Sequence, residues 1–240
     1  MLIAFLSDVH GNMPALRAAV ASATACGAER IVCSGDMTGY GPFPDDVCNF
    51  LQDRQIPALI GNYDRKVLAV GTDLKSVPRK SKKRKILLWT VRHLSHQALA
   101  YLSALPDQIE MQLCSGHQLI VVHGSPLSPD DVIYPSITRP VLASKLGNLK
   151  PDLLVCGHTH IPFVRRIGGA LVVNCGSAGQ PVDGDPRPSF ALVSAEEGAL
   201  PRGRIIRFDY ERQQTIAALA KSSLPKDLRS DLANGAKRRY

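Results

Sequence analysis

Five short apolar stretches of this 240-residue chain are each followed closely by aspartate, asparagine or histidine. The stretches are residues 2–6, 31–33, 58–60, 119–122 and 153–155. Apolar runs of this length between turn signals are typical of buried strands. In open α/β sheets the functional crevice lies outside the carboxyl ends of the strands. We therefore expect polar side chains that are far apart in the sequence to converge at one edge.

The segments that follow the five stretches contain the residue types that bind metal ions. They read SDVHGN with Asp8 and His10, SGDMTG with Asp36, GNYD with Asn62 and Asp64, HGSP with His123, and CGHTH with His158 and His160. Each segment alone is ordinary, because aspartate, asparagine and glycine favour turns. Together, and in this order, they predict one site rich in carboxylate and imidazole groups.

The order of the elements predicts an α/β fold with two mixed sheets packed as a sandwich. A helix over residues 15–25 begins near Pro14 and ends at Gly27, and a weaker helix is expected over residues 44–53. Two short helices follow, over residues 86–94 and 96–105. The second half turns to hairpins, which pair residues 108–113 with 118–122, 161–167 with 170–173, and 190–194 with 204–210.

We expect one domain over residues 1–212, and a C-terminal helix and polar tail over residues 213–240. No apolar run reaches the ~18 residues of a membrane span, and the first residues read as a strand and not as a signal peptide. Six cysteines are scattered without a Cys-x-x-Cys spacing, which is typical of buried free thiols in a cytoplasmic protein.

The positive charge of the chain is concentrated in one segment. The net charge is +8, and residues 75–85 hold seven basic residues and no acidic one, so the rest carries 8 − 7 = +1. The segment has no interleaved aromatic residues, which proteins that bind single-stranded nucleic acid usually employ. A solvated basic loop is therefore favoured over a nucleic-acid-binding role.

This set of motifs resembles the calcineurin-like metallophosphoesterase superfamily, on its branch of small bacterial and archaeal phosphodiesterases. The family pattern is D-x-H, G-D, G-N-x-[DE], H-G and G-H-x-H, and residues 174–190 resemble its closing N-x-G-S-x-G segment. The resemblance leaves out residues 75–85 and those after about 211. It implies two sheets flanked by helices in four layers.

The resemblance also implies a centre of two metal ions. Its ligands would be Asp8, His10 and His160 for the first ion, Asn62, His123 and His158 for the second, and Asp36 between them. The candidate catalytic residues are Asn62, Asp64 and His123. Asn62 would stabilise charge on the phosphate, and Asp64 would orient a ligand histidine. Gly157 would let the backbone approach the site closely.

The ligand chemistry narrows the choice of metal and reaction. Four imidazoles are too many for Mg²⁺ or Ca²⁺, which prefer oxygen. Two divalent transition-metal ions fit, with Mn²⁺ favoured and Fe, Zn, Co or Ni as alternatives. Such a pair clamps a phosphate and supplies a metal-bound hydroxide that attacks phosphorus. The expected activity is hydrolysis of a small phosphodiester or of a nucleotide phosphoanhydride.

One position departs from the phosphomonoesterase pattern of the family. There the asparagine is followed by a histidine that helps to protonate the leaving group, whereas Tyr63 follows Asn62 here. A tyrosine is a poor general acid at neutral pH, so a ring that packs over the site is at least as good an interpretation. Tyr63 and Tyr40 are the candidate substrate-binding residues, and this departure favours diesters.

Two alternatives belong to other functional classes. A scaffold with this fold, as in a retromer subunit of eukaryotes, would not require seven ligands, and the metal content of the protein would separate the two hypotheses. A nucleic-acid partner for residues 75–85 is the less favoured alternative. The sequence predicts no oligomeric state and no membrane partner.

Overall fold

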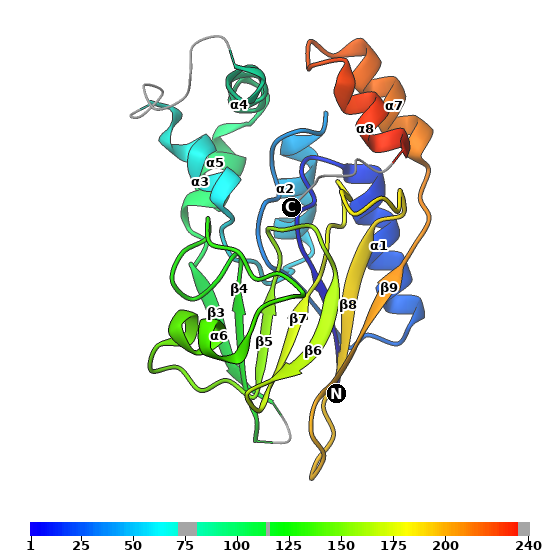
Figure 1. Cartoon of the computed structure of the whole chain (residues 1–240). Coiled ribbons are helices and arrows are strands. Elements are labelled where there is room, and N and C mark those ends of the chain that lie inside the picture. The colour runs from blue at the N-terminus through cyan, green and yellow to red at the C-terminus, as the bar shows by residue number, and fades with distance from the viewer. Residues whose placement is uncertain (72–80, 114–115, 235–240) are drawn as a thin grey trace.

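The computed structural model describes residues 1–71, 81–113 and 116–234, and within these ranges nine strands form two mixed sheets (Figure 1). The first has the order β2-β1-β8-β9 and the second β3-β4-β5-β7-β6. The strands are β1 (Leu2–Leu6), β2 (Arg30–Cys33), β3 (Gln108–Gln112), β4 (Gln118–Val122), β5 (Leu153–Cys156), β6 (Phe163–Ile167), β7 (Ala170–Asn174), β8 (Ser189–Ser194) and β9 (Arg202–Arg207).

Helices cover the outer faces of both sheets. They are α1 (Met13–Ala25), α2 (Pro44–Asp53), α3 (Asn62–Leu68), the 3₁₀ helix η1 (Ala69–Gly71), α4 (Lys82–Arg92), α5 (His96–Ser103), α6 (Arg139–Leu146), α7 (Arg212–Lys221) and α8 (Asp227–Asn234). Of the helices in the described ranges, α6 packs on the outer face of the second sheet, through Leu142 and Leu146. The other helices that contribute to a core do so on the side of the first sheet. The predicted sandwich flanked by helices is confirmed.

Strand β1 shows how one apolar run serves two cores. Successive side chains of a strand point to opposite faces, so Ile3 and Phe5 pack between the two sheets, whereas Ala4 and Leu6 pack beneath the helices. A strand buried on both faces reads as a continuous apolar run.

Several local predictions need correction. Residues 58–60 do not form a strand, because only Ala58 makes a parallel bridge, to Cys33. The amide of Ile60 then donates to the carbonyl of Pro106, so the chain leaves the sheet before α3. Helices α3, α6 and α8 and the 3₁₀ helix η1 were not predicted. The hairpins β3–β4, β6–β7 and β8–β9 are confirmed.

The loops after β1, β2 and β5 are hydrogen-bonded into one edge. The amides of Asp8 and His10, after β1, donate to the carbonyls of Gly35 and Asp36, after β2. Across the sandwich, the amide of His158 donates to Asp8 Oδ2 at 2.9 Å. This bond ties the two sheets together at their carboxyl ends, where the predicted site residues lie.

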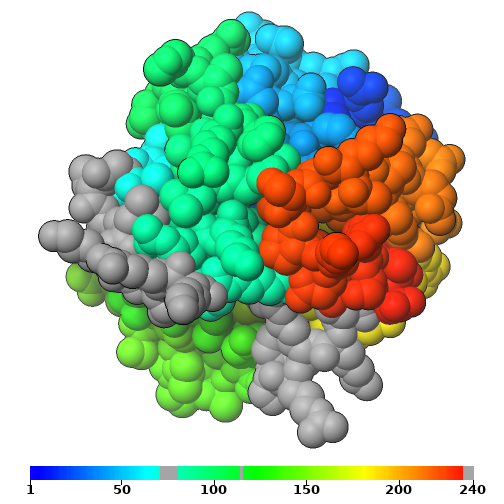
Figure 2. Space-filling view, turned by 90° about the horizontal axis from the view of Figure 1, so that it is seen from above, coloured from blue at the N-terminus to red at the C-terminus, as the bar shows by residue number. Residues whose placement is uncertain are grey.

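The basic segment is only partly described, since residues 75–80 lie outside the described ranges. Residues 82–85 form the first turn of α4, which Ser81 caps through its hydroxyl. Lys82 pairs with Asp227 and Asp231 of α8. Seen from above, α8 accordingly lies beside α4 (Figure 2).

The described cysteines are free thiols, and all except Cys26 are buried. A cytoplasmic location, which such thiols favour, stays a prediction. Among the described helices, none has the length and apolar character to cross a membrane. The domain boundary at residue 212 also stays a prediction.

Candidate metal centre

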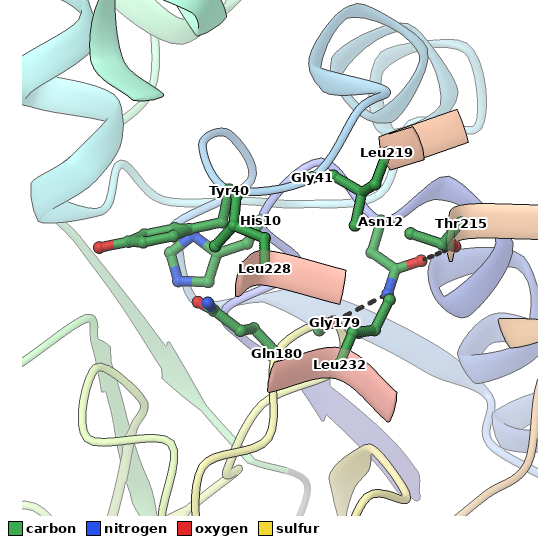
Figure 3. Close-up of a pocket in the computed structure, with 10 residues that line it drawn as sticks. All are labelled: His10, Asn12, Tyr40, Gly41, Gly179, Gln180, Thr215, Leu219, Leu228 and Leu232. Carbon is green, nitrogen blue, oxygen red and sulfur yellow. Dashed lines mark hydrogen bonds between the residues drawn. The ribbon is translucent and has the colours of Figure 1, made fainter. Parts of the chain in front are cut away.

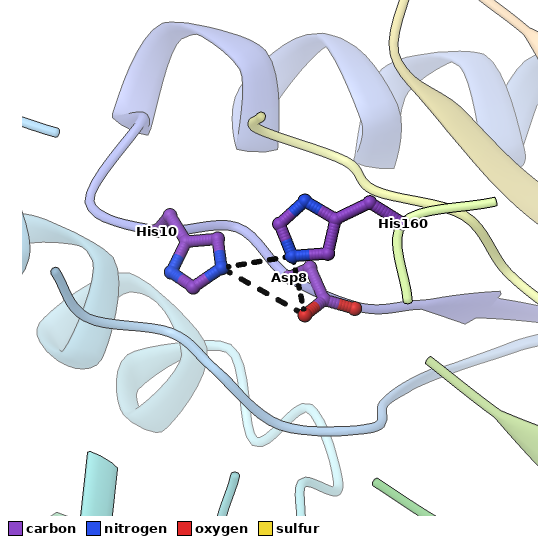
Figure 4. A group of neighbouring side chains, drawn as sticks. All are labelled: Asp8, His10 and His160. Atoms are coloured by element: carbon purple, nitrogen blue, oxygen red, sulfur yellow. Dashed lines mark hydrogen bonds and ion pairs between the residues drawn. The ribbon is translucent and has the colours of Figure 1, made fainter. Parts of the chain in front are cut away.

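Asp8, His10 and His160 form a buried cluster (Figure 4). The two imidazoles face each other, with their Nε2 atoms 3.2 Å apart. Asp8 Oδ1 lies 3.1 Å from Nε2 of His160 and 3.7 Å from Nε2 of His10. Residues about 150 positions apart thus present three ligand atoms to one point, as the sequence predicts.

A second cluster consists of Asp36, His123 and His158. His123 Nε2 lies 3.4 Å from Asp36 Oδ2, and it also lies 3.2 Å from Asn62 Oδ1. The same Asp36 oxygen is 3.7 Å from Nε2 of His10 in the first cluster. Asp36 therefore stands between the two clusters.

Backbone carbonyls fix the orientation of three of the histidines. The Nδ1 atoms of His10, His123 and His160 lie 2.9, 2.8 and 2.6 Å from the carbonyl oxygens of Thr38, Ser34 and Gln180. Because a carbonyl only accepts, each Nδ1 donates its proton there. In the neutral ring, Nε2 then presents a lone pair to the cluster, which is the usual arrangement of a metal-binding histidine.

The charges of the two clusters favour the binding of a cation. Asp8 Oδ1 is buried without a hydrogen-bond donor. Burial alone would raise the pKa of Asp8, but His160, His123 and His10 together bring it well below its usual range. Burial disfavours the charged form of His123, yet the Asp36 carboxylate beside it raises the pKa of His123 to about 10. Ionised buried carboxylates beside converging ring nitrogens therefore attract positive charge, and divalent ions suit this donor set.

The backbone at the centre is strained. Among the described residues, seven that are not glycine have positive φ, and five of them are candidate ligands, with φ between 49° and 64°. These are Asp8, His10, Asp36, His158 and His160. Such conformations cost energy and concentrate at functional sites, where the surrounding structure holds them.

Gly157 brings β5 close enough to complete the centre, as predicted. A Cβ atom at this position would lie 1.9 Å from the Ser7 hydroxyl oxygen and 2.6 Å from Asp8 Oδ2. Any larger residue would therefore push the loop of His158 and His160 away from Asp8.

Asp64 was expected to orient a candidate ligand histidine, and in the structure its carboxylate does not contact one directly. Its carboxylate accepts hydrogen bonds from the amides of Met37, Thr38 and Gly61 and from the Thr38 hydroxyl. It instead holds the loop after β2, whose Thr38 carbonyl accepts the proton of His10.

Asp130 was missed by the sequence analysis. Its Oδ1 accepts a hydrogen bond of 2.7 Å from Asn62 Nδ2, so the Asn62 carbonyl oxygen faces His123. Lys66 of α3 donates to the same Asp130 oxygen at 2.7 Å. No periodicity or motif marks Asp130, because its contact with Asn62 exists only in the folded chain.

The two candidate substrate-binding tyrosines lie beside His10. The Tyr40 ring meets His10 edge to face at 4.8 Å, and the Tyr63 ring lies 5.1 Å from that of Tyr40. The Tyr63 hydroxyl is buried without a hydrogen-bond partner. Burial, with Tyr40 and Asp36 nearby, raises the pKa of Tyr63 far above its ordinary value. This environment supports packing over proton transfer.

Comparison with known proteins agrees with this geometry. Residues 1–198 match the family model of the calcineurin-like phosphoesterase superfamily domain. The crystal structure of a metallophosphoesterase from Sphaerobacter thermophilus is 30% identical, covers 98% of this chain and 99% of its own, and superposes with a TM-score of 0.79.

Two curated relatives match over most of their length. The protein MJ0912 of Methanocaldococcus jannaschii is 29% identical and covers 93% of this chain and 94% of its own. The phosphodiesterase YfcE of Escherichia coli is 26% identical over 190 residues, which are 78% of this chain and 84% of YfcE. The chain therefore belongs to the calcineurin-like phosphoesterase superfamily and is an enzyme of the metal-dependent phosphoesterase class.

Proposed function

We propose that this protein hydrolyses phosphodiester or nucleotide phosphoanhydride bonds at a centre of two divalent metal ions. The observation that supports this most strongly is the position of Asp36, whose Oδ2 lies within 3.7 Å of an imidazole nitrogen in each cluster. The proposed ligands are Asp8, His10 and His160 for one ion, Asn62, His123 and His158 for the other, and Asp36 for both.

The bound ions would polarise the phosphoryl oxygens and lower the pKa of the attacking water. The chain's own residues then have separate tasks. His10, His123 and His160 keep their protons at Nδ1 on backbone carbonyls and leave Nε2 free for the ions. The Asn62 amide carries two N–H groups, of which one goes to Asp130, so the other is free to donate to a phosphate oxygen.

Mn²⁺ is the ion that we propose, with Fe, Zn, Co and Ni as the alternatives. The decisive experiment removes metal with a chelator and restores Mn²⁺ before a panel of diesters, dinucleotides and monoesters is offered. We expect turnover of diesters or anhydrides only after metal is restored. Full turnover by the metal-free protein would refute the proposal, and binding of metal without any turnover would favour a scaffold.

Asp130→Ala is expected to weaken binding of one of the two ions by about 10–100-fold, the usual effect of losing a group that orients a metal ligand. The reason is that Asn62 would be free to turn its carbonyl oxygen away from His123. Calorimetric titration of the metal-free protein with Mn²⁺ measures this affinity directly.

The matched control is Asp107→Ala, which removes an ion pair with Arg65, the neighbour of Lys66 on α3. Asp107 is exposed and is not among the contacts of the centre. Equal metal affinity in the Asp130 variant and the Asp107 control would show that Asn62 keeps its orientation without Asp130.

The basic segment is expected to be dispensable for hydrolysis. In the variant, serine replaces every Lys and Arg of residues 75–85 except Lys82, which is kept because it holds α8. The kcat/KM for a small diester should stay within about twofold of wild type, since surface substitutions have small effects. Loss of RNA binding together with a shallower salt dependence would instead favour the nucleic-acid alternative.

A further inference from the structure

The two clusters of the metal centre differ in their access to solvent. The candidate ligands of the first cluster, Asp8, His10 and His160, are all buried. There α7 and α8 line a pocket together with His10 and Tyr40, and its space of about 20 Å³ is room for about one water molecule (Figure 3). In the second cluster, His158 is only partly buried. We therefore expect a substrate group that extends beyond the phosphate to leave the centre beside the second cluster.

Lys66 of α3 lies on this more open side. It follows Asn62 by four residues on the helix, so the two side chains stand on the same face. Lys66 Nζ and Asn62 Nδ2 each lie 2.7 Å from Oδ1 of Asp130. The two nitrogens are therefore at most 5.4 Å apart, twice the length of one such bond. Because Asn62 Oδ1 lies 3.2 Å from Nε2 of His123, the ammonium group stands at the rim of the second cluster.

The ammonium group of Lys66 has hydrogen-bonding capacity for a ligand. It carries three N–H groups, and within the described ranges it donates one hydrogen bond, to Asp130. The side chain is 47% exposed, so a phosphate oxygen can replace water at the other two N–H groups. Burial raises the pKa of Asp130, but hydrogen bonds from Lys66 and Asn62 and the charges of Lys66 and His158 hold that pKa below its usual range. Asp130 therefore stays ionised and keeps the ammonium group beside Asn62.

We infer that Lys66 binds the phosphate next to the one that is attacked, and that the protein prefers phosphoanhydrides to diesters with a single phosphate. Asn62 keeps one N–H group for the attacked phosphate. The two phosphates of an anhydride share a bridging oxygen, so the second phosphate is the direct neighbour of the first and comes within reach of Lys66. This inference rests on the proposed function and specifies its substrate class.

The chemistry of an anhydride suits this arrangement. Hydrolysis adds the oxygen of water to one phosphorus and breaks the bridging P–O bond, whose electron pair stays on the leaving phosphate. The two protons of water pass to the product phosphates or to solvent. A leaving phosphate needs less help from a general acid than an alkoxide does, and the buried hydroxyl of Tyr63 is poorly suited to give that help. The Lys66 ammonium group would instead stabilise the negative charge that develops on the leaving phosphate.

Two dinucleoside substrates test the inference, because they differ in the number of phosphates. Diadenosine 5′,5′-diphosphate contains an anhydride, whereas adenylyl-(3′→5′)-adenosine contains one phosphodiester. The kcat/KM is measured for both with Mn²⁺ present, and the readout is the ratio of the anhydride value to the diester value. We expect wild type to prefer the anhydride. Lys66→Ala should lower the ratio by about tenfold or more, the usual effect of losing a hydrogen bond between charged groups.

Two further variants serve as controls. Lys66→Arg keeps the positive charge and should keep most of the ratio. Arg65→Ala is the matched control, because Arg65 precedes Lys66 on α3 and pairs with the exposed Asp107. Its ratio should equal that of wild type. An unchanged ratio in Lys66→Ala overturns the inference, and a fall in Mn²⁺ affinity with that unchanged ratio would show that Lys66 only holds Asp130 in place.

Binding without turnover gives a second measurement. Wild type and Lys66→Ala, both loaded with Mn²⁺, are titrated calorimetrically with adenosine 5′-monophosphate and with the α,β-methylene analogue of adenosine 5′-diphosphate, whose bridge cannot be hydrolysed. Lys66→Ala should weaken binding of the analogue about tenfold more than binding of the monophosphate. Equal effects on the two ligands would contradict a contact with the second phosphate.

The outcomes also separate this inference from the proposed function. If wild type with Mn²⁺ hydrolyses neither dinucleoside, the proposed function fails and the inference fails with it. If wild type hydrolyses them and Lys66→Ala keeps the wild-type ratio, the inference alone is refuted.

Discussion

Asp36→Asn is expected to lower kcat/KM for a diester by at least about 10²-fold while the fold survives. Removing a group that only orients a metal ligand already lowers metal affinity or activity by about 10–100-fold. Asp36 is proposed to bind both ions itself, so its loss should have a larger effect. Asparagine keeps the shape of the side chain, so the hydrogen bond of 2.7 Å from the Tyr63 amide to Oδ1 can persist. The lost feature is the negative charge between the clusters.

Three measurements on the same preparation test this prediction. Activity with Mn²⁺ gives the loss, elemental analysis after dialysis gives the metal content, and circular dichroism reports the fold. Asp107→Asn is the control, because it removes an exposed carboxylate away from the centre. Full activity and full metal content in the Asp36 variant would exclude the two-metal mechanism.

Wild type is expected to hydrolyse bis(p-nitrophenyl) phosphate faster than an alkyl phosphomonoester, with Mn²⁺ supplied. An alkoxide is a poor leaving group without a proton donor, and general acid assistance is worth about 10²–10⁴-fold. Tyr63 cannot give that help readily, because its hydroxyl is buried and its surroundings raise its pKa. An aryl leaving group needs less assistance.

Two variants of Tyr63 separate packing from proton transfer. The Tyr63 ring packs tightly on Gly39, since a Cβ atom built on Gly39 would lie 2.3 Å from the ring. Tyr63→Phe keeps this packing and removes only the hydroxyl, so it should leave both rates unchanged. Tyr63→His should raise the monoester rate and narrow the gap. A lower monoester rate in the phenylalanine variant would show that the hydroxyl takes part, and a wild-type preference for the monoester would point to another acid.

The sequence was most informative where a side chain directly follows a buried strand. Asp8 and His10 follow β1, and His158 and His160 follow β5, so their place at the edge of a sheet is set by local order. The structure adds that the two pairs meet through Nε2 of His10 and His160. Asn62 was expected after a strand, yet it begins α3, and it still reaches His123.

The sequence was least informative about residues that orient a candidate metal ligand without binding the metal ion themselves. Asp64 was expected to orient a candidate ligand histidine. In the structure its carboxylate binds the loop of Thr38, and backbone carbonyls such as that of Ser34 contact the imidazoles directly. Asp130 and α8 carry no local signal, whereas a helix in the segment of α7 was expected. Helix α8 is short, and its apolar residues Leu228 and Leu232 are buried only because they pack on the core beside the first sheet.

By itself, the sequence determined the family, the two-sheet sandwich and the kind of side chain that follows β1, β2, β4 and β5, because these depend on strand periodicity and on the residues that directly follow those strands. Only the tertiary structure decided which candidate ligands share a cluster, which carbonyls orient the imidazoles, and that α7 and α8 line a small pocket beside His10. Those contacts join residues up to about 200 positions apart, as between Asn12 and Thr215, and packing of the whole chain brings them together.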